Sequence, residues 1–208
     1  MAKTAIPVII TLLLFIITTH VVSIPSFKSA LLESKKQLPI DLSMTVLSLL
    51  SNYESRVRLG EISPAEARKR AILRIRDLRY GPENKYYFWI NDTTPRMVMH
   101  PYRSELEGKD LTYYADSSGK RLFVEMVDVA KKNKSGFVEY IWQWTDKTDL
   151  ETKKISYVVL FEPWQWIIGT GVYYRDVEHV INDLTKNINR AFTAIIIIVA
   201  MVSSFVII

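Results

Sequence analysis

A histidine close to alternating aromatic residues is the first feature of this chain that could bind a ligand. It is His100, near the end of the stretch YYFWINDTTPRMVMHPY at 86–102. Side chains two residues apart in a strand point to the same face, so Tyr87 and Trp89 share one face of this stretch. Such rings beside a few cationic donors would form an aromatic-walled cavity suited to a small carboxylate.

Residues of the same types recur at strand spacing further along the chain. One expected strand has three aromatic rings on the same face, those of Tyr140, Trp142 and Trp144. The side chains of the next expected strand also alternate between two faces. One face would carry Lys154, Ser156 and Val158, and the other would carry Ile155, Tyr157 and Val159. The basic residues Arg76 and Arg79 precede the first strand. The structural alternative is that most of these rings form the core and that His100 only ends a strand.

The motifs that mark enzymes and metal sites are missing from the chain. It has no cysteine, and no G-x-S-x-G, Walker, G-x-G-x-x-G, H-E-x-x-H or EF-hand pattern. Its histidines are too far apart in sequence to predict a zinc site. Asp146, Asp149 and Glu151 are better explained by a solvated loop than by calcium binding. The net charge of +5 is mild and comes without a nucleic-acid-binding motif. We therefore expect no enzyme, no cofactor, no metal and no nucleic-acid partner.

Two apolar runs without fixed charge, at 5–24 and 191–208, frame the chain. About 20 helical residues span roughly 30 Å, the thickness of a bilayer core. We expect both runs to be transmembrane helices, the second cut by the end of the chain. The alternatives are a cleavable signal peptide for the first run and a buried core helix for the second. Long segments translocate largely regardless of charge, so we place 25–190 outside the cytoplasmic membrane.

The segment between these runs has the pattern of an α+β domain. It begins with a long helix at 26–59, which Pro39 is expected to kink or break. Ser63 as N-cap, Pro64 and Glu66 then predict the start of a second helix. The dipeptide Gly81-Pro82 is expected to end that helix.

From residue 85 onward the hydrophobic pattern changes to a period of two. The expected strands lie at 85–91, 95–101, 136–144, 153–162 and 166–173, with one helix at 118–136 and a hairpin loop at 146–152. The two glycines of GTG, Gly169 and Gly171, indicate a bulge or a close backbone approach in the last strand. A final helix then leads into the second apolar run.

The ordered motifs of this segment resemble those of a single Cache domain of the sCache_2 type, over about residues 28–185. They are LRYG, YYFWIND, PRMVMHPY, LEGKDL, GKRLFVEMV, GFVEYIW, KISYV and FEPWQWIIGTGVY. The resemblance implies a long N-terminal helix packed on a PAS-like antiparallel sheet. It also implies ligand sensing in bacterial chemoreceptors, sensor histidine kinases or cyclic-nucleotide-signalling enzymes. Ligands of such domains are often two- to four-carbon acids such as acetate, propionate, pyruvate or lactate.

The resemblance also implies which residues contact the ligand. A basic residue before the sheet, an aromatic residue of the first strand and the histidine of the His-Pro pair approach it; the Y-x-W and K-x-S-Y motifs supply the rest. Where the family often has Pro-Lys-Pro after Y-x-W, this chain has QWTDK, so the resemblance does not extend to that loop. With the strand pattern, the candidate ligand-binding residues are Arg76, Arg79, Tyr87, Trp89, His100, Tyr140, Trp142, Lys154 and Tyr157.

We therefore expect the extracytoplasmic sensor region of a receptor in the bacterial inner membrane, with a methyl-accepting chemotaxis protein favoured. It would bind a short-chain carboxylate, form a homodimer through its helices, and signal through the second membrane helix to cytoplasmic partners by way of an output domain beyond residue 208. The alternatives are the sensor region of a histidine kinase or cyclic-dinucleotide enzyme, or a membrane-anchored interaction domain with a vestigial pocket.

Overall fold

The computed structural model describes residues 2–144 and 147–206, and the chain separates into two compact units. One unit contains the residues up to Glu33 and those from Arg175 onward, and the other is Ser34–Tyr174. The candidate ligand-binding residues all belong to the second unit. Asp146 of the expected hairpin loop, and residues 207–208 of the second apolar run, lie outside the described residues.

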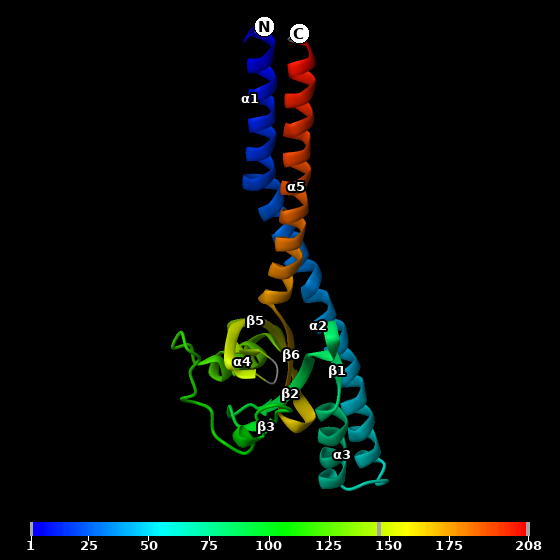
Figure 1. The fold of residues 1–208 in the computed structure, drawn as a ribbon. Coiled ribbons are helices and arrows are strands. Elements are labelled where there is room, and N and C mark those ends of the chain that lie inside the picture. Colours follow the sequence, from blue (N-terminus) through cyan, green and yellow to red (C-terminus); the bar gives the residue numbers. More distant parts are fainter. Residues whose placement is uncertain (1, 145–146, 207–208) are drawn as a thin grey trace. The chain divides into compact units, whose positions relative to one another are not determined.

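The first unit is helical. It holds α1 (Ala2–Thr18), the π-helical turn η1 (Thr19–Ser23), the beginning of α2 (Ile24–Arg58) and most of α5 (Tyr174–Val206). Within it α1 and α5 lie side by side (Figure 1), with the rings of Phe15 and Phe192 5.6 Å apart. The helical segments Ile9–Arg58 and Tyr174–Val202 are long and apolar enough to cross a membrane.

The helices of the second unit confirm some of the expected signals and correct others. The expected break at Pro39 is wrong, because α2 continues through this residue to Arg58. The N-cap is confirmed: the Ser63 hydroxyl accepts a hydrogen bond from the Glu66 N–H at 3.2 Å at the start of α3 (Pro64–Arg76). However, α3 ends before Gly81, because the chain turns into the short strand β1 (Arg79–Tyr80).

A six-stranded antiparallel sheet forms the centre of this unit. Its other strands are β2 (Tyr86–Asp92), β3 (Met97–Met99), β4 (Ser135–Trp144), β5 (Lys147–Phe161) and β6 (Trp166–Tyr173). The strand order is β1-β2-β6-β5-β4; β1 pairs with the beginning of β2, and β3 pairs with Ile90 and Asn91 near its end. Single turns of 3-10 helix connect these elements at η2 (Pro82–Asn84), η3 (Ser104–Leu106) and η4 (Glu162–Trp164).

Two boundaries in the sheet differ from the expectation for a physical reason. The strand expected from residue 153 begins at Lys147, since polar residues of the expected loop pair with β4, as in Gln143 opposite Glu151. The helix expected to close at Gly136 is α4 (Leu122–Asn133), and Lys134 with φ +67° caps it. Polar composition and the glycine pattern were therefore misleading at these two places.

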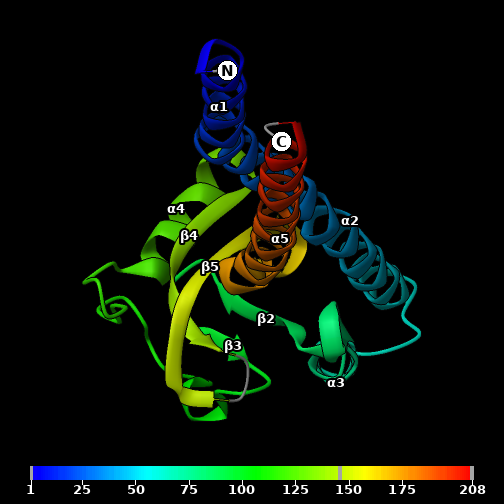
Figure 2. The ribbon, with the colours of Figure 1, turned by 45° about the horizontal axis from the view of Figure 1, so that its top comes forward.

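Helices cover both faces of the sheet (Figure 2). The α4 face buries, among strand residues, Tyr87, Trp89, Tyr140, Trp142, Val158 and Ile167. The α2–α3 face buries Phe88, Ile90, Val159, Phe161, Trp166 and Ile168. The alternation expected in β2 and β5 is confirmed. It gives the unit two separate cores, one on each side of the same strands.

Candidate functional site

A buried lysine inside a ring of aromatic side chains is the most unusual feature of the α4 face. Lys154 of β5 is only 1% exposed, and its Nζ has no hydrogen-bond partner among the described residues. Nζ lies 4.0 Å from the centre of the Tyr87 ring, 5.1 Å from that of Trp89 and 4.9 Å from that of Tyr173. We call these three rings around Lys154 the aromatic cage.

Strand register and two glycines explain how the sequence builds the cage. Lys154 pairs with Tyr173 of β6, and β2, which carries Tyr87 and Trp89, is the next strand beyond β6. Strand β6, which lies between β2 and β5, carries Gly169 next to the Trp89 ring. A Cβ added at Gly169 would lie 2.1 Å from that ring. The missing side chain leaves room for the indole. The expected close backbone approach is confirmed at Gly171, where a Cβ would lie 2.2 Å from the Ile155 carbonyl oxygen.

The cage contains an amino group without an anionic partner among the described residues. Burial lowers the pKa of Lys154 well below its usual value. The three rings attract an ammonium group, but desolvation opposes the charge more strongly. Burial also raises the pKa of the Tyr87 and Tyr140 hydroxyls well above the usual value, so these groups stay protonated. The site therefore holds a proton-accepting amine and no negative charge among the described residues.

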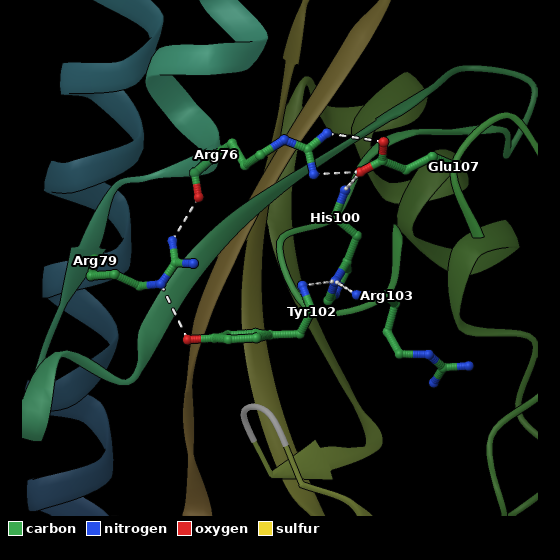
Figure 3. A network of polar contacts seen from close by, with 6 residues as sticks. All are labelled: Arg76, Arg79, His100, Tyr102, Arg103 and Glu107. Carbon is green, nitrogen blue, oxygen red and sulfur yellow. Dashed lines mark hydrogen bonds and ion pairs between the residues drawn. The ribbon is translucent and has the colours of Figure 1, made fainter. Parts of the chain in front are cut away.

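His100 borders the cage as a neutral donor. Its Nδ1 accepts hydrogen bonds from the backbone N–H groups of Tyr102 at 3.2 Å and Arg103 at 3.0 Å (Figure 3). Because Nδ1 is an acceptor, the ring proton of the neutral imidazole must sit on Nε2. Burial holds the pKa of His100 well below its usual value. The ring lies 5.1 Å from that of Tyr87 and 5.7 Å from that of Trp142.

Trp142 adds a second unpaired donor to the same cluster. Its Nε1 is buried and makes no hydrogen bond of normal geometry among the described residues, although Trp142 slightly offsets the raised pKa of the Tyr87 hydroxyl. The ring lies 6.0 Å from that of Tyr140, whose hydroxyl is 2.9 Å from the Ser156 Oγ. Lys154 pairs directly with Tyr140 across β4 and β5, so these groups form one continuous patch.

The two predicted arginines have other partners in this structure. The two terminal guanidinium nitrogens of Arg76 contact the Glu107 carboxylate, at 2.8 Å and 2.9 Å. The same carboxylate accepts a hydrogen bond from the backbone N–H of His100 at 2.9 Å (Figure 3). Arg79 donates to the Tyr102 hydroxyl at 3.1 Å and to the Arg76 carbonyl. These contacts fix the backbone around His100. Arg79 lies opposite Tyr87 of the cage in the β1–β2 pair, and its guanidinium lies 5.0 Å from the centre of the Tyr102 ring.

Other candidates divide between the two faces of the sheet. Trp89 is in the cage, and its Nε1 donates to Asn91 Oδ1 at 3.3 Å. Tyr157 is on the α2–α3 face instead, with its ring 5.2 Å from that of Phe137. Strand alternation explains this placement, because Tyr157 is an odd number of residues from Lys154. The K-x-S-Y motif therefore brings only its lysine to the cage.

Two residues at the site were missed from the sequence. Tyr173 belongs to the cage, and the period of two in β6, through Gly169 and Gly171, could have found it. Arg103 donates to Gln143 Oε1 at 3.1 Å, and its guanidinium lies 5.7 Å from the centre of the Trp142 ring. It follows the His-Pro pair in an irregular segment, where no periodic signal exists.

A groove lies between α2 and α3, on the other side of the sheet. This groove has a volume of about 880 Å³ and is lined by Leu49, Tyr53, Arg56, Arg70, Leu73, Arg74, Asp77 and Leu78. Two of its arginines already have carboxylate partners, Arg56 with Glu61 and Arg70 with Glu66. The cage, with its unpaired buried donors, is the better candidate for a ligand site.

Comparison with known families and proteins identifies related sequences. Residues 32–187 match the family described as Single Cache domain 2. The methyl-accepting chemotaxis protein McpP of Pseudomonas putida KT2440 is 36% identical over 148 residues, 71% of this chain and 27% of that protein. The sensor histidine kinase MctS of Rhizobium johnstonii is 29% identical over 181 residues, 85% of this chain and 38% of that protein. The chain thus spans well under half the length of either relative.

Solved structures agree with these matches. A periplasmic sensor domain of a chemotaxis protein is 40% identical, with a TM-score of 0.64, and the match covers 69% of this chain and 96% of that one. A Cache chemosensory domain described as recognising carboxylic acids is 37% identical, with a TM-score of 0.65, covering 70% of this chain and 97% of that one.

Proposed function

Because this chain belongs to the single Cache domain family, we propose that its aromatic cage binds a small carboxylate as the input of a transmembrane receptor. The observation that carries the proposal is a set of buried donors without acceptors. Lys154 Nζ and Trp142 Nε1 are unpaired among the described residues, and His100 must carry its proton on Nε2. A ligand that matches them offers acceptors and no donors.

A deprotonated carboxylate has this chemistry, with two oxygens and about four lone-pair positions. Neither an ammonium nor a guanidinium group can accept a hydrogen bond, so an amine ligand would leave the donors unpaired. Unpaired buried donors each lower stability by about 1–3 kcal/mol, and a carboxylate would remove that loss. The related Cache domain that recognises carboxylic acids supports the same ligand class.

The surroundings favour a short ligand with little polar surface beyond its carboxylate. Tyr87, Trp89 and Trp142 are each no more than 4% exposed, so a ligand in contact with their rings would itself be enclosed. The ligand's carbon chain would then lie against aromatic faces. Acids of two to four carbons, such as acetate, propionate, pyruvate and lactate, fit this description.

The cage also offers a route for the signal. Tyr173, one of its rings, is the last residue of β6, and α5 begins at the next residue, Tyr174. A ligand that changes the preferred position of Tyr173 would act directly at the start of that helix. A shift of tenfold in the conformational equilibrium needs about 1.4 kcal/mol of differential binding.

The receptor context completes the proposal. Residues 5–24 and 191–208 would span the bacterial inner membrane, and 25–190 would lie outside the cytoplasm, with dimer contacts through helices. The chemotaxis relative favours a methyl-accepting receptor. The histidine kinase relative supports a kinase as the second candidate output.

Calorimetry on the purified full chain in detergent tests the ligand. Acetate, propionate, pyruvate and lactate are titrated in turn, with acetamide as the uncharged comparison. We expect at least one carboxylate to bind and acetamide not to bind. Lys154→Met should abolish binding, whereas Lys153→Met, at the exposed neighbouring position of β5, should leave the Kd unchanged.

Two outcomes would contradict the proposal. One is the absence of binding by any carboxylate at millimolar concentration, which would favour an interaction domain with a vestigial pocket. The other is unchanged affinity in Lys154→Met, which would place the ligand elsewhere.

A further inference from the structure

The charge state of Lys154 has a consequence for ligand binding. A lysine ammonium that is fully buried normally has a carboxylate or several acceptors around it. Lys154 Nζ has neither among the described residues, and its neighbours are the faces of three aromatic rings. Without ligand, the neutral amine is therefore the more stable form of this side chain.

The titratable neighbours of Lys154 on each packed element do not change this balance. They are Tyr87 from β2, Tyr173 from β6, Tyr140 from β4 and His100 after β3. Burial keeps the hydroxyls of Tyr87 and Tyr140 protonated and the His100 ring neutral. The α4 helix presents apolar residues to this face. None of these groups supplies the negative charge that an ammonium would need.

A bound carboxylate supplies that charge. In the enclosed site an ammonium–carboxylate pair is strongly favoured over an amine next to a carboxylate, because the Coulomb attraction is weakly screened. The proton that makes the pair must come from solution, or enter on the acid itself. The balance is the same in either case: one amine, one carboxylate and one proton form the complex.

We propose that the cage takes up one proton with each carboxylate it binds, so that the receptor responds to the concentration of undissociated acid rather than to that of total carboxylate. This inference rests on the proposed function of the cage and adds its regulation. A given amount of acid would produce a stronger response in an acidified medium than in an alkaline one.

Calorimetry in several buffers measures the proton directly. At about pH 8.5 a short carboxylic acid is fully ionised and an ordinary lysine is almost fully charged, so an unperturbed site would take up no proton. The binding enthalpy of the full chain is measured in phosphate, HEPES and Tris, which release different heats on ionisation. We expect a slope that corresponds to about one proton taken up per carboxylate. The Kd should rise about tenfold for each pH unit in this range.

Two variants assign the proton. His100→Gln retains a side-chain donor but cannot take up a proton, so uptake of about one should persist if Lys154 is the acceptor. Lys153→Met, the exposed control, should also show uptake of about one proton per carboxylate. A carboxylate that binds with no proton uptake overturns this inference and leaves the proposed function intact. Loss of uptake in His100→Gln moves the proton to His100 and also overturns it, whereas the absence of carboxylate binding overturns both proposals.

A measurement without ligand gives an independent test. The pKa of Lys154 is lower in the folded chain than in the unfolded chain, so between the two values the unfolded chain binds more protons, and stability rises with pH. Lys154→Met lacks this contribution. The Tm of the wild type should therefore rise relative to that of Lys154→Met as the pH rises toward the usual pKa of a lysine, about 10.4. A Tm difference that does not change with pH would show that Lys154 stays charged, and would overturn the inference.

Discussion

The two faces of the sheet use the same strands for different purposes. On the α2–α3 face, apolar side chains meet apolar helices, and the Trp164 indole donates to Glu54 Oε2 at 2.6 Å. On the α4 face, Lys154 and Trp142 carry unpaired buried donors among the described residues. In α2 the buried hydroxyl of Ser43 is also unpaired among the described residues, but a helical serine can turn toward the carbonyl one turn earlier.

This difference separates a face that stabilises the fold from a face that is incomplete without a ligand. Unpaired donors are unfavourable in the folded state, so a sequence selected for stability alone would replace them. Because Lys154 and Trp142 both lie on the α4 face, we expect the core on the α2–α3 face to supply more of the stability of the fold. Substitutions on the two faces should accordingly change different measured quantities.

The largest expected effect on stability belongs to the α2–α3 face. Ile168→Ala removes a fully buried side chain of β6 and should lower the free energy of unfolding by about 2–5 kcal/mol. Ligand affinity of the folded protein should stay within about twofold of wild type, and Ile168→Val should lower stability by only about 0.5–1.5 kcal/mol. Denaturation followed by tryptophan fluorescence, with calorimetry, measures both. A matching fall in affinity would show that the two faces are not independent.

Lys154→Met should have the opposite sign. Methionine has a similar length and no donor, so the ligand-free protein should gain about 1–3 kcal/mol in its free energy of unfolding near neutral pH. The control Lys153→Met should be close to wild type. A loss of stability in Lys154→Met would show that the amine has a favourable partner in the folded state, against the proposed role of the cage.

Trp142→Phe tests the second unpaired donor with little change in shape. We expect the Kd for the carboxylate to rise about tenfold, or about 1.4 kcal/mol, while the Tm hardly changes. Trp166→Phe, a buried indole on the α2–α3 face, is the matched comparison and should leave the Kd unchanged. Equal effects of the two variants would remove Trp142 from the site.

The smallest expected effect is at the start of α3, outside both faces. Ser63→Ala removes the hydroxyl that accepts the Glu66 N–H and should lower the free energy of unfolding by about 1 kcal/mol. Ligand affinity should not change, and Ser63→Asp, which keeps an acceptor, should restore the stability. Thermal unfolding of the three proteins is sufficient; an altered Kd in Ser63→Ala would indicate coupling between α3 and the cage.

Local patterns predicted the elements of the fold better than their ends. The cap at Ser63 and the alternation of Tyr87 with Phe88 were readable because both depend on neighbours close in sequence. The start of β5 at Lys147 was not, since cross-strand pairing gave polar residues a regular structure. The cap at Lys134 was not either, because a lysine rarely adopts the left-handed conformation that it has there. Pro39 also did not stop α2, because a helix can lose one backbone hydrogen bond and continue.

The candidate site was predicted in part. Tyr87, Trp89, His100, Trp142 and Lys154 do come together on the α4 face, but the expected cationic donors His100 and Lys154 are neutral there. The direction of the arginine side chains could not be predicted from the sequence. Arg76 points to Glu107, a residue far along the chain. Tyr157 could have been placed on the other face from its odd spacing to Lys154 alone.

The sequence by itself determined the residue types available to the site and, through the period of two, the face of the sheet on which each strand residue lies. It also determined the long apolar runs and the helix cap, because these depend only on near neighbours. Only the tertiary structure decided that Lys154 has rings and no carboxylate around it, and that His100 carries its proton on Nε2. Those properties depend on which distant segments pack together, and burial, charge and hydrogen bonding act through space rather than along the chain.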